Sequence, residues 1–154
     1  SWTNIVVGGL AGSFAVLAGA AAVDPKLGAP GLLLAAVLFF WTPPHFWSLA
    51  IANRADYAAA AVPMLPVVAG TERAAWIVWW NTLALVAVSL VAPVIGAAGV
   101  VYTLGAGLGG AYFLRKAWLL ARAPSRKSAM ACFFASLIQL SVVLVAASLD
   151  VLIR

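Results

Sequence analysis

The stretch WTPPHFWSLAIANRADY, residues 41–57, joins the end of a long apolar run to the charged segment that follows it. The apolar run covers residues 31–52 and has the length of a membrane-spanning helix, which needs about 20 predominantly apolar residues. Inside the run lie two adjacent prolines and the single histidine of the chain, His45, and Arg54 and Asp56 follow directly. The stretch therefore predicts a transmembrane helix with polar groups near one end.

The composition extends this interpretation to the whole chain. Of its 154 residues, 66% are hydrophobic and only 8% are charged, whereas soluble domains carry about 25% charged residues. We predict an all-α, polytopic transmembrane helix bundle with five spans. The apolar runs that define them are residues 5–23, 31–52, 74–93, 100–121 and 129–149.

The basic residues gather at alternate ends of these spans. Because consecutive loops lie on opposite sides of a bilayer, seven basic residues fall on one side: Arg54, Arg73, Arg115, Lys116, Arg122, Arg126 and Lys127. Only Lys26 and Arg154 fall on the other side. Cytoplasmic loops are enriched in Lys and Arg, so we expect the connections at residues 53–73 and 122–128 to be cytoplasmic.

Other classes of function fit the composition poorly. The net charge of +5 comes from scattered basic residues that do not alternate with exposed aromatics, so we expect no nucleic-acid partner. A single cysteine, Cys132, cannot form a disulfide or a paired thiolate metal site within the chain. The chain begins at Ser1 without a methionine, which suggests a fragment of a longer protein.

His45 is the strongest candidate for a functional residue inside the membrane, where ionisable groups are costly. It precedes Ala52 by seven residues, or about 10 Å of helix. Trp41, His45 and Ser48 share one helix face, which we expect to point into a cytoplasmic cavity. Pro43 and Pro44 predict a kink or an unwound turn just before His45. The structural alternative is that His45 bonds a carbonyl freed by these prolines.

Four polar side chains follow the span directly: Asn53, Arg54, Asp56 and Tyr57. A carboxylate suits Mg²⁺, which prefers oxygen ligands, and a guanidinium suits phosphate oxygens. The alternative is ordinary interfacial anchoring, with Asp56 paired to Arg54. One carboxylate is not a complete magnesium site, and by the predicted topology Asp24 and Asp150 lie on the opposite side of the membrane.

Intramembrane amides and glycines give weaker signals. The amides are Asn4, Asn81 and Gln139. Interhelical hydrogen bonding is the commoner use of such side chains, although they would also suit the cavity expected beside His45. Small residues four apart allow close approach of helices. The glycine pairs with this spacing are Gly8 with Gly12 and Gly105 with Gly109.

Several segments together resemble a known family. WTPPHFWSLAIANRADY followed by AVPMLPVVAGT (residues 61–71) resembles the second polar motif of protohaem IX farnesyltransferases, the haem O synthases of the UbiA-type intramembrane prenyltransferases. TNIVVGGLAG (residues 3–12) is similar to the start of that family's fifth helix. SRKSAMACFFASL (residues 125–137) is similar to the lead into its last helix.

The resemblance implies a nine-helix fold of which these are helices five to nine. Residues 1–154 would then be the C-terminal part of a single transmembrane prenyltransferase domain, without the N-terminal helices and their Asp-rich motif. The implied reaction transfers a farnesyl group from farnesyl diphosphate to a vinyl group of haem B, giving haem O. The implied location is the bacterial inner membrane, with contact to haem A synthase or terminal oxidase assembly.

The resemblance also implies roles for residues. Asp56 would hold Mg²⁺ on the diphosphate, Arg54 would neutralise that leaving group, and His45 would lie on the haem or acid–base side. Tyr57 would line the mouth of the cavity. Trp41 and Asn53 would contribute to substrate binding together with His45 and Arg54.

Three alternatives remain open. A related prenyltransferase would use a quinone precursor as acceptor. A transporter would use His45 and Asp56 as a proton relay. A structural membrane subunit would need neither residue for activity.

Overall fold

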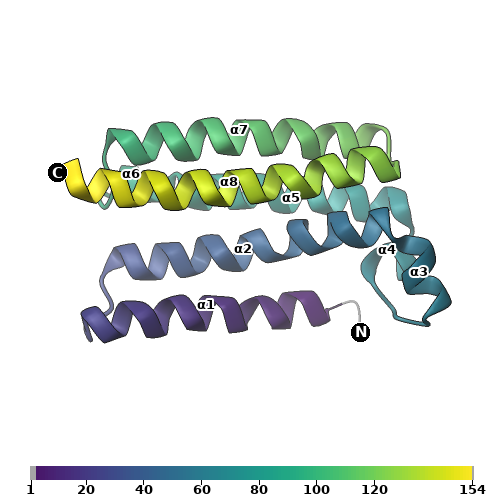
Figure 1. Cartoon of the computed structure of the whole chain (residues 1–154), viewed down its shortest axis with the longest axis horizontal. Helices are drawn as coiled ribbons and strands as arrows, with labels where there is room; N and C mark the ends of the chain where they lie inside the picture. Colours follow the sequence, from purple (N-terminus) through teal and green to yellow (C-terminus); the bar gives the residue numbers. More distant parts are fainter. Residues whose placement is uncertain (1–2, 154) are drawn as a thin grey trace.

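The computed structural model describes residues 3–153, and every regular element in that range is an α-helix (Figure 1). Five helices are long: α1 (Asn4–Val23), α2 (Ala29–Ala52), α5 (Thr71–Ser89), α7 (Val100–Arg122) and α8 (Arg126–Ile153). Three are short: α3 (Arg54–Ala59), α4 (Leu65–Val68) and α6 (Val91–Val94). The all-α prediction is confirmed, and each of the five apolar runs lies within one long helix or, for residues 74–93, within α5 and the start of α6.

Four segments are long and apolar enough to cross a membrane: Asn4–Val23, Ala29–Ala52, Thr71–Val94 and Arg126–Ile153. The remaining long helix, α7, has a comparable length but includes Arg115 and Lys116, which shorten its apolar stretch. The five predicted spans therefore correspond to the five long helices in residues 3–153, and four of these helices have the composition of a transmembrane segment.

Helix α2 lies at the centre of the arrangement. It contacts α1 on one side and α5 and α8 on the other, while α7 packs against both α5 and α8 (Figure 1). Within residues 3–153, α2 is the only helix that α1 contacts. One hydrogen bond joins these two helices, from the Ser13 hydroxyl to the Ala35 carbonyl at 3.0 Å. The bundle core therefore lies among α2, α5, α7 and α8, with α1 on its outside.

The close approach of α7 and α8 takes place at glycine, as predicted. A Cβ atom built on Gly105 would lie 2.5 Å from the Ala146 Cβ, and one built on Gly109 would lie 3.5 Å from the Gln139 Cα. For the pair Gly8 with Gly12 the prediction is confirmed only at Gly12, whose Cβ position lies 3.3 Å from the Leu38 Cδ2 of α2, whereas Gly8 faces no neighbouring helix within 4 Å in the described part of the chain. Gly9 contacts α2 instead, with the Thr42 Cβ at 3.2 Å.

The ends of the long helices alternate as the topology predicts. The start of α1, the short helices α3 and α4, and the connection from α7 to α8 lie at one end of the bundle (Figure 1). The turn between α1 and α2, helix α6 and the end of α8 lie at the other. Asp24 and Asp150 are thus at the opposite end from Asp56, whereas Arg154 lies outside the described residues.

Candidate functional site

Helix α2 continues through its proline pair. Pro43 and Pro44 lie inside a single α-helix that ends at Ala52, so the predicted unwound turn is absent from this described segment. Both prolines are buried, and α2 is enclosed by helices on both sides. The hydroxyl of Ser48 also donates to the Pro44 carbonyl. Neighbouring helices and hydroxyl side chains compensate for proline in membrane helices, which explains why α2 stays helical although proline usually interrupts a helix.

His45 is held between two aromatic rings. Its ring stacks on Trp41 with a centroid distance of 4.1 Å and on Phe133 of α8 with a centroid distance of 4.5 Å. Its Nδ1 lies 2.7 Å from the Ser136 Oγ. The expected alternative, a bond to a carbonyl freed by proline, is therefore not the contact that His45 makes. The histidine instead joins α2 to α8.

The predicted polar face of α2 exists, but it packs against a helix. Trp41, His45 and Ser48 are all buried, and the Trp41 indole Nε1 donates to the Ser136 carbonyl at 2.8 Å. The expected opening of this face into a cavity is wrong for the described residues, because α8 covers it. Sequence reasoning missed Ser136 and Phe133. The available signal was the helical spacing of Cys132, Ser136 and Gln139, which places them on one face of α8.

The charged segment after α2 is separate from His45. Helix α2 ends at Ala52, and the chain resumes as α3 after Asn53, whose side chain donates to the Leu49 carbonyl at 3.2 Å. Arg54 donates from Nε to the Pro66 carbonyl at 2.9 Å, which ties α3 to α4. Asp56 is exposed in the first turn of α3, and Tyr57 is partly buried. The structure thus gathers Asn53, Arg54, Asp56 and Tyr57 at one end of the bundle.

A magnesium ion would find few ligands in these residues. Among residues 3–153, no group of three His, Cys, Asp or Glu side chains lies close enough to hold a metal ion. Arg54 also does not make the expected ion pair with Asp56 among the described residues, since it donates to the Pro66 carbonyl instead. The described residues do not form a magnesium site by themselves, and Asp56 as one ligand stays a prediction.

The intramembrane amides differ in their surroundings. Asn4 is exposed. Gln139 is fully buried, and within the described part of the chain neither its Nε2 nor its Oε1 has a hydrogen-bond partner. The Asn81 Oδ1 is likewise buried and unpaired among these residues. Among the described residues, Gln139 therefore does not form the interhelical hydrogen bond that we expected. It lies one turn beyond Ser136 on α8.

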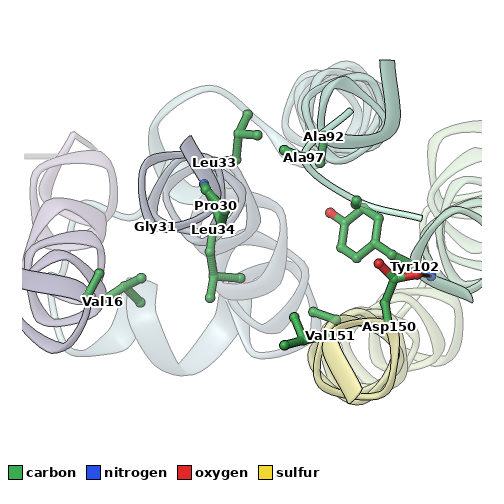
Figure 2. A pocket seen from close by; sticks show the side chains of 13 residues that line it. Val16, Pro30, Gly31, Leu33, Leu34, Ala92, Ala97, Tyr102, Asp150 and Val151 are labelled. Atoms are coloured by element: carbon green, nitrogen blue, oxygen red, sulfur yellow. Dashed lines mark hydrogen bonds between the residues drawn. The ribbon is translucent and has the colours of Figure 1, made fainter. Parts of the chain in front are cut away.

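A cavity of about 340 Å³ lies at the opposite end of the bundle, between α1, α2, the start of α7 and the end of α8. Figure 2 shows Pro30 and Leu34 of α2 across the cavity from Tyr102 and Asp150. Asp150 accepts hydrogen bonds from the backbone N–H groups of Gly99, at 2.6 Å, and Tyr102, at 3.2 Å. Its carboxylate therefore caps the start of α7, and the cavity walls are otherwise mostly apolar.

Comparisons with known proteins identify relatives that match nearly the whole chain. Protoheme IX farnesyltransferase 2 of Paramagnetospirillum magneticum is 56% identical over 150 residues, which cover 97% of this chain and 52% of the relative. Protoheme IX farnesyltransferase 1 of the same organism is 50% identical over 149 residues, covering 97% and 53%. The protoheme IX farnesyltransferase of Gloeobacter violaceus is 45% identical over 148 residues, covering 96% and 48%.

The chain thus spans about half the length of these curated relatives. No solved structure matches it significantly. The model of the UbiA prenyltransferase family matches residues 1–138, a range that includes His45, Arg54, Asp56 and Ser136. Since this match covers most of the sequence, the chain belongs to the UbiA prenyltransferase family.

Proposed function

We propose that the gene product carrying this chain is a haem O synthase of the bacterial inner membrane. The observation that carries the proposal is the 56% and 50% identity to two proteins named protoheme IX farnesyltransferase, over 97% of the chain. Those relatives are about twice as long as this chain. On this proposal residues 1–154 contribute the C-terminal part of one catalytic domain, with α7 as the fifth membrane span. The proposed substrates are farnesyl diphosphate and haem B.

The reaction proposed for the gene product breaks the bond between the farnesyl C1 and the diphosphate oxygen, and the diphosphate leaves with the electron pair. The vinyl group of haem B forms the new carbon–carbon bond with the farnesyl C1, which leaves a carbocation on the former vinyl group. Water adds to this carbocation as the hydroxyl group and releases one proton. A negatively charged leaving group needs compensating charge, which preorganised cationic groups supply. A water-poor interior protects the cationic farnesyl group.

Arg54 is the proposed contact for the diphosphate. Its side chain donates to the Pro66 carbonyl through Nε, and the proposal assigns its two terminal nitrogens to phosphate oxygens. Paired donors of this kind match phosphate geometry. Asp56, on the same exposed helix, would act with ligands from elsewhere in the gene product. Because the described residues do not complete a metal site, no step is assigned to Mg²⁺.

His45 is the proposed contact on the haem side or the acid–base group. Its ring is fixed by Trp41, Phe133 and Ser136. Its Nδ1 is occupied by the Ser136 contact, which leaves Nε2 as the nitrogen for proton exchange. The ring is only 7% exposed, so a partner would have to reach it from within the bundle.

The proposal is tested by measuring haem O in membranes of a bacterium that lacks its own haem O synthase and expresses the gene product. Asp56→Asn and Arg54→Gln should each lower haem O at least a hundredfold, the typical effect of removing one group that stabilises developing charge. Asp24→Asn is the matched control, because it makes the same chemical change to an exposed carboxylate at the opposite end of the bundle. Variant protein levels are compared by immunoblot.

Unchanged haem O in the Asp56 and Arg54 variants would contradict the assigned residues. Absence of haem O with the unmodified protein, together with prenylation of 4-hydroxybenzoate, would replace the haem acceptor by a quinone precursor. Ion transport without any dependence on diphosphate would instead favour the proton-relay alternative for His45 and Asp56.

A further inference from the structure

A second cavity, of about 610 Å³, lies between the start of α5 and the end of α7. We call it the α5–α7 cavity, and its charged lining residues are Glu72, Arg73 and Arg122. It is separate from the segment with Arg54 and Asp56, because α3 contacts only α2 and α4 within the described residues. Neither the proposed diphosphate contact nor the proposed haem contact lines it.

The cavity is positively charged overall. It holds two guanidinium groups and one carboxylate, and all three residues are exposed. Arg122 lies over the Trp118 ring, 5.7 Å from its centroid. The structure records no ion pair for Arg73 or Arg122 among residues 3–153. An excess of two guanidinium groups over one carboxylate, at the end of the bundle where the basic residues gather, favours an anionic ligand.

One tryptophan of a three-tryptophan cluster lines the same cavity. Trp76 lines it and packs edge-to-face against Trp79 and Trp118, with centroid distances of 6.0 and 5.7 Å. Trp79 also contacts Trp118 at 5.5 Å. Tryptophan is enriched at the level of lipid headgroups, where its ring is partly apolar and its N–H is polar. The cluster therefore indicates that the cavity lies at the membrane–water interface rather than in the aqueous phase.

Apolar surface continues from the cavity along α5 toward the middle of the membrane. Ile77 lines the cavity, and Trp80, about one turn further, is 60% exposed. The ligand therefore meets cationic groups at one end and an exposed apolar helix face at the other. Free phosphate would use only the first feature, whereas a membrane lipid would use both.

We propose that the α5–α7 cavity binds the phosphate headgroup of an anionic membrane phospholipid. Arg73 and Arg122 face the phosphate, the tryptophan cluster surrounds the glycerol region, and the acyl chains lie along the exposed face of α5. Basic pockets between transmembrane helices bind anionic headgroups in this way. Glu72 reduces the affinity, because its carboxylate repels the phosphate.

The test reconstitutes the gene product in nanodiscs of phosphatidylcholine with a minor share of phosphatidylglycerol. The lipids that remain bound after extraction into detergent are counted by native mass spectrometry. The unmodified protein should retain phosphatidylglycerol in preference to phosphatidylcholine. The double variant R73Q/R122Q should lose about thirtyfold in this preference, since each basic residue near an anionic surface contributes about fivefold.

A matched double variant controls for general electrostatic attraction. R115Q/R126Q removes the same two charges from the same end of the bundle, but neither residue lines the α5–α7 cavity. It should keep most of the preference. Glu72→Gln should increase the preference by up to about fivefold, a gain that misfolding would not produce.

Three outcomes would overturn the proposal. Equal losses in the two double variants would show attraction by net charge alone. Equal retention of phosphatidylcholine and phosphatidylglycerol by the unmodified protein would show an aromatic belt without headgroup selection. Displacement of phosphatidylglycerol by inorganic phosphate at equal concentration would show a site for the free anion. None of these measurements depends on haem O formation, so failure of one proposal leaves the other intact.

Discussion

Replacement of Gly105 by alanine should weaken the contact between α7 and α8. The added Cβ would lie 2.5 Å from the Ala146 Cβ and 3.5 Å from the Val142 Cγ1. The first distance is far shorter than the roughly 3.5–4.0 Å at which carbon atoms attract each other. Because Ala146 is buried on a long helix, the helices themselves must separate to admit the methyl group.

The cost follows from two opposing terms. Overpacking a well-packed contact costs about 1–3 kcal/mol, while alanine in place of glycine inside a helix gains about 1 kcal/mol. Gly107→Ala on the same helix carries only the second term, because in the described part of the chain no other helix comes within 4 Å of its Cβ position. The difference between the two variants therefore isolates the packing cost of about 1–3 kcal/mol.

Thermal unfolding of the gene product in detergent, followed by tryptophan fluorescence, measures this difference. At about 1–2 °C per kcal/mol for a protein about twice as long as this chain, Gly105→Ala should melt roughly 1–6 °C below Gly107→Ala. Combining Gly105→Ala with Ala146→Gly should recover part of the loss, as expected for residues in direct contact. Equal melting temperatures for the two alanine variants, or a double variant with no recovery, would refute the close approach at Gly105.

Two further predictions concern buried polar groups. Asp150→Ala should lower the melting temperature by several degrees, because it removes both acceptors that cap the start of α7. A lost cap costs about 0.5–2 kcal/mol. Asp24→Ala, which removes an exposed carboxylate, is the control, and equal shifts in melting temperature would contradict the capping role. Gln139→Leu should raise the melting temperature, because burying an unpaired amide costs about 1–3 kcal/mol. A lower melting temperature for Gln139→Leu would mean that the amide is paired in the folded protein.

Apolar runs located the long helices well, because a membrane span is a local property of about 20 consecutive residues. Each long helix matches a predicted run to within about four residues at its ends, including α8, which begins at Arg126 and ends at Ile153. Composition also separates α7 from the other four, since Arg115 and Lys116 lie within it. These features need no knowledge of which helices are neighbours.

Contacts between helices could not be predicted in the same way. The partner of His45, Ser136, is 91 residues away in the chain, and no local pattern in either helix pairs the two residues. A spacing of four fits both Gly8 with Gly12 and Gly9 with Ser13, which differ by one residue along α1. Only the position of α2 shows which of them meet it: Gly9 contacts Thr42, Gly12 contacts Leu38 and Ser13 bonds to Ala35, whereas Gly8 does not face α2.

The division of residues 41–57 into two environments bears on how the proposed site works. His45 lies in the interior seven residues before α2 ends, about 10 Å along the helix, while Asp56 is exposed on α3. One small group cannot touch both residues. On the proposed function, the charged diphosphate stays at the exposed end and the apolar substrate parts extend inward. Variants of Arg54 and Asp56 should therefore change the dependence on farnesyl diphosphate, and variants of His45 the dependence on haem B.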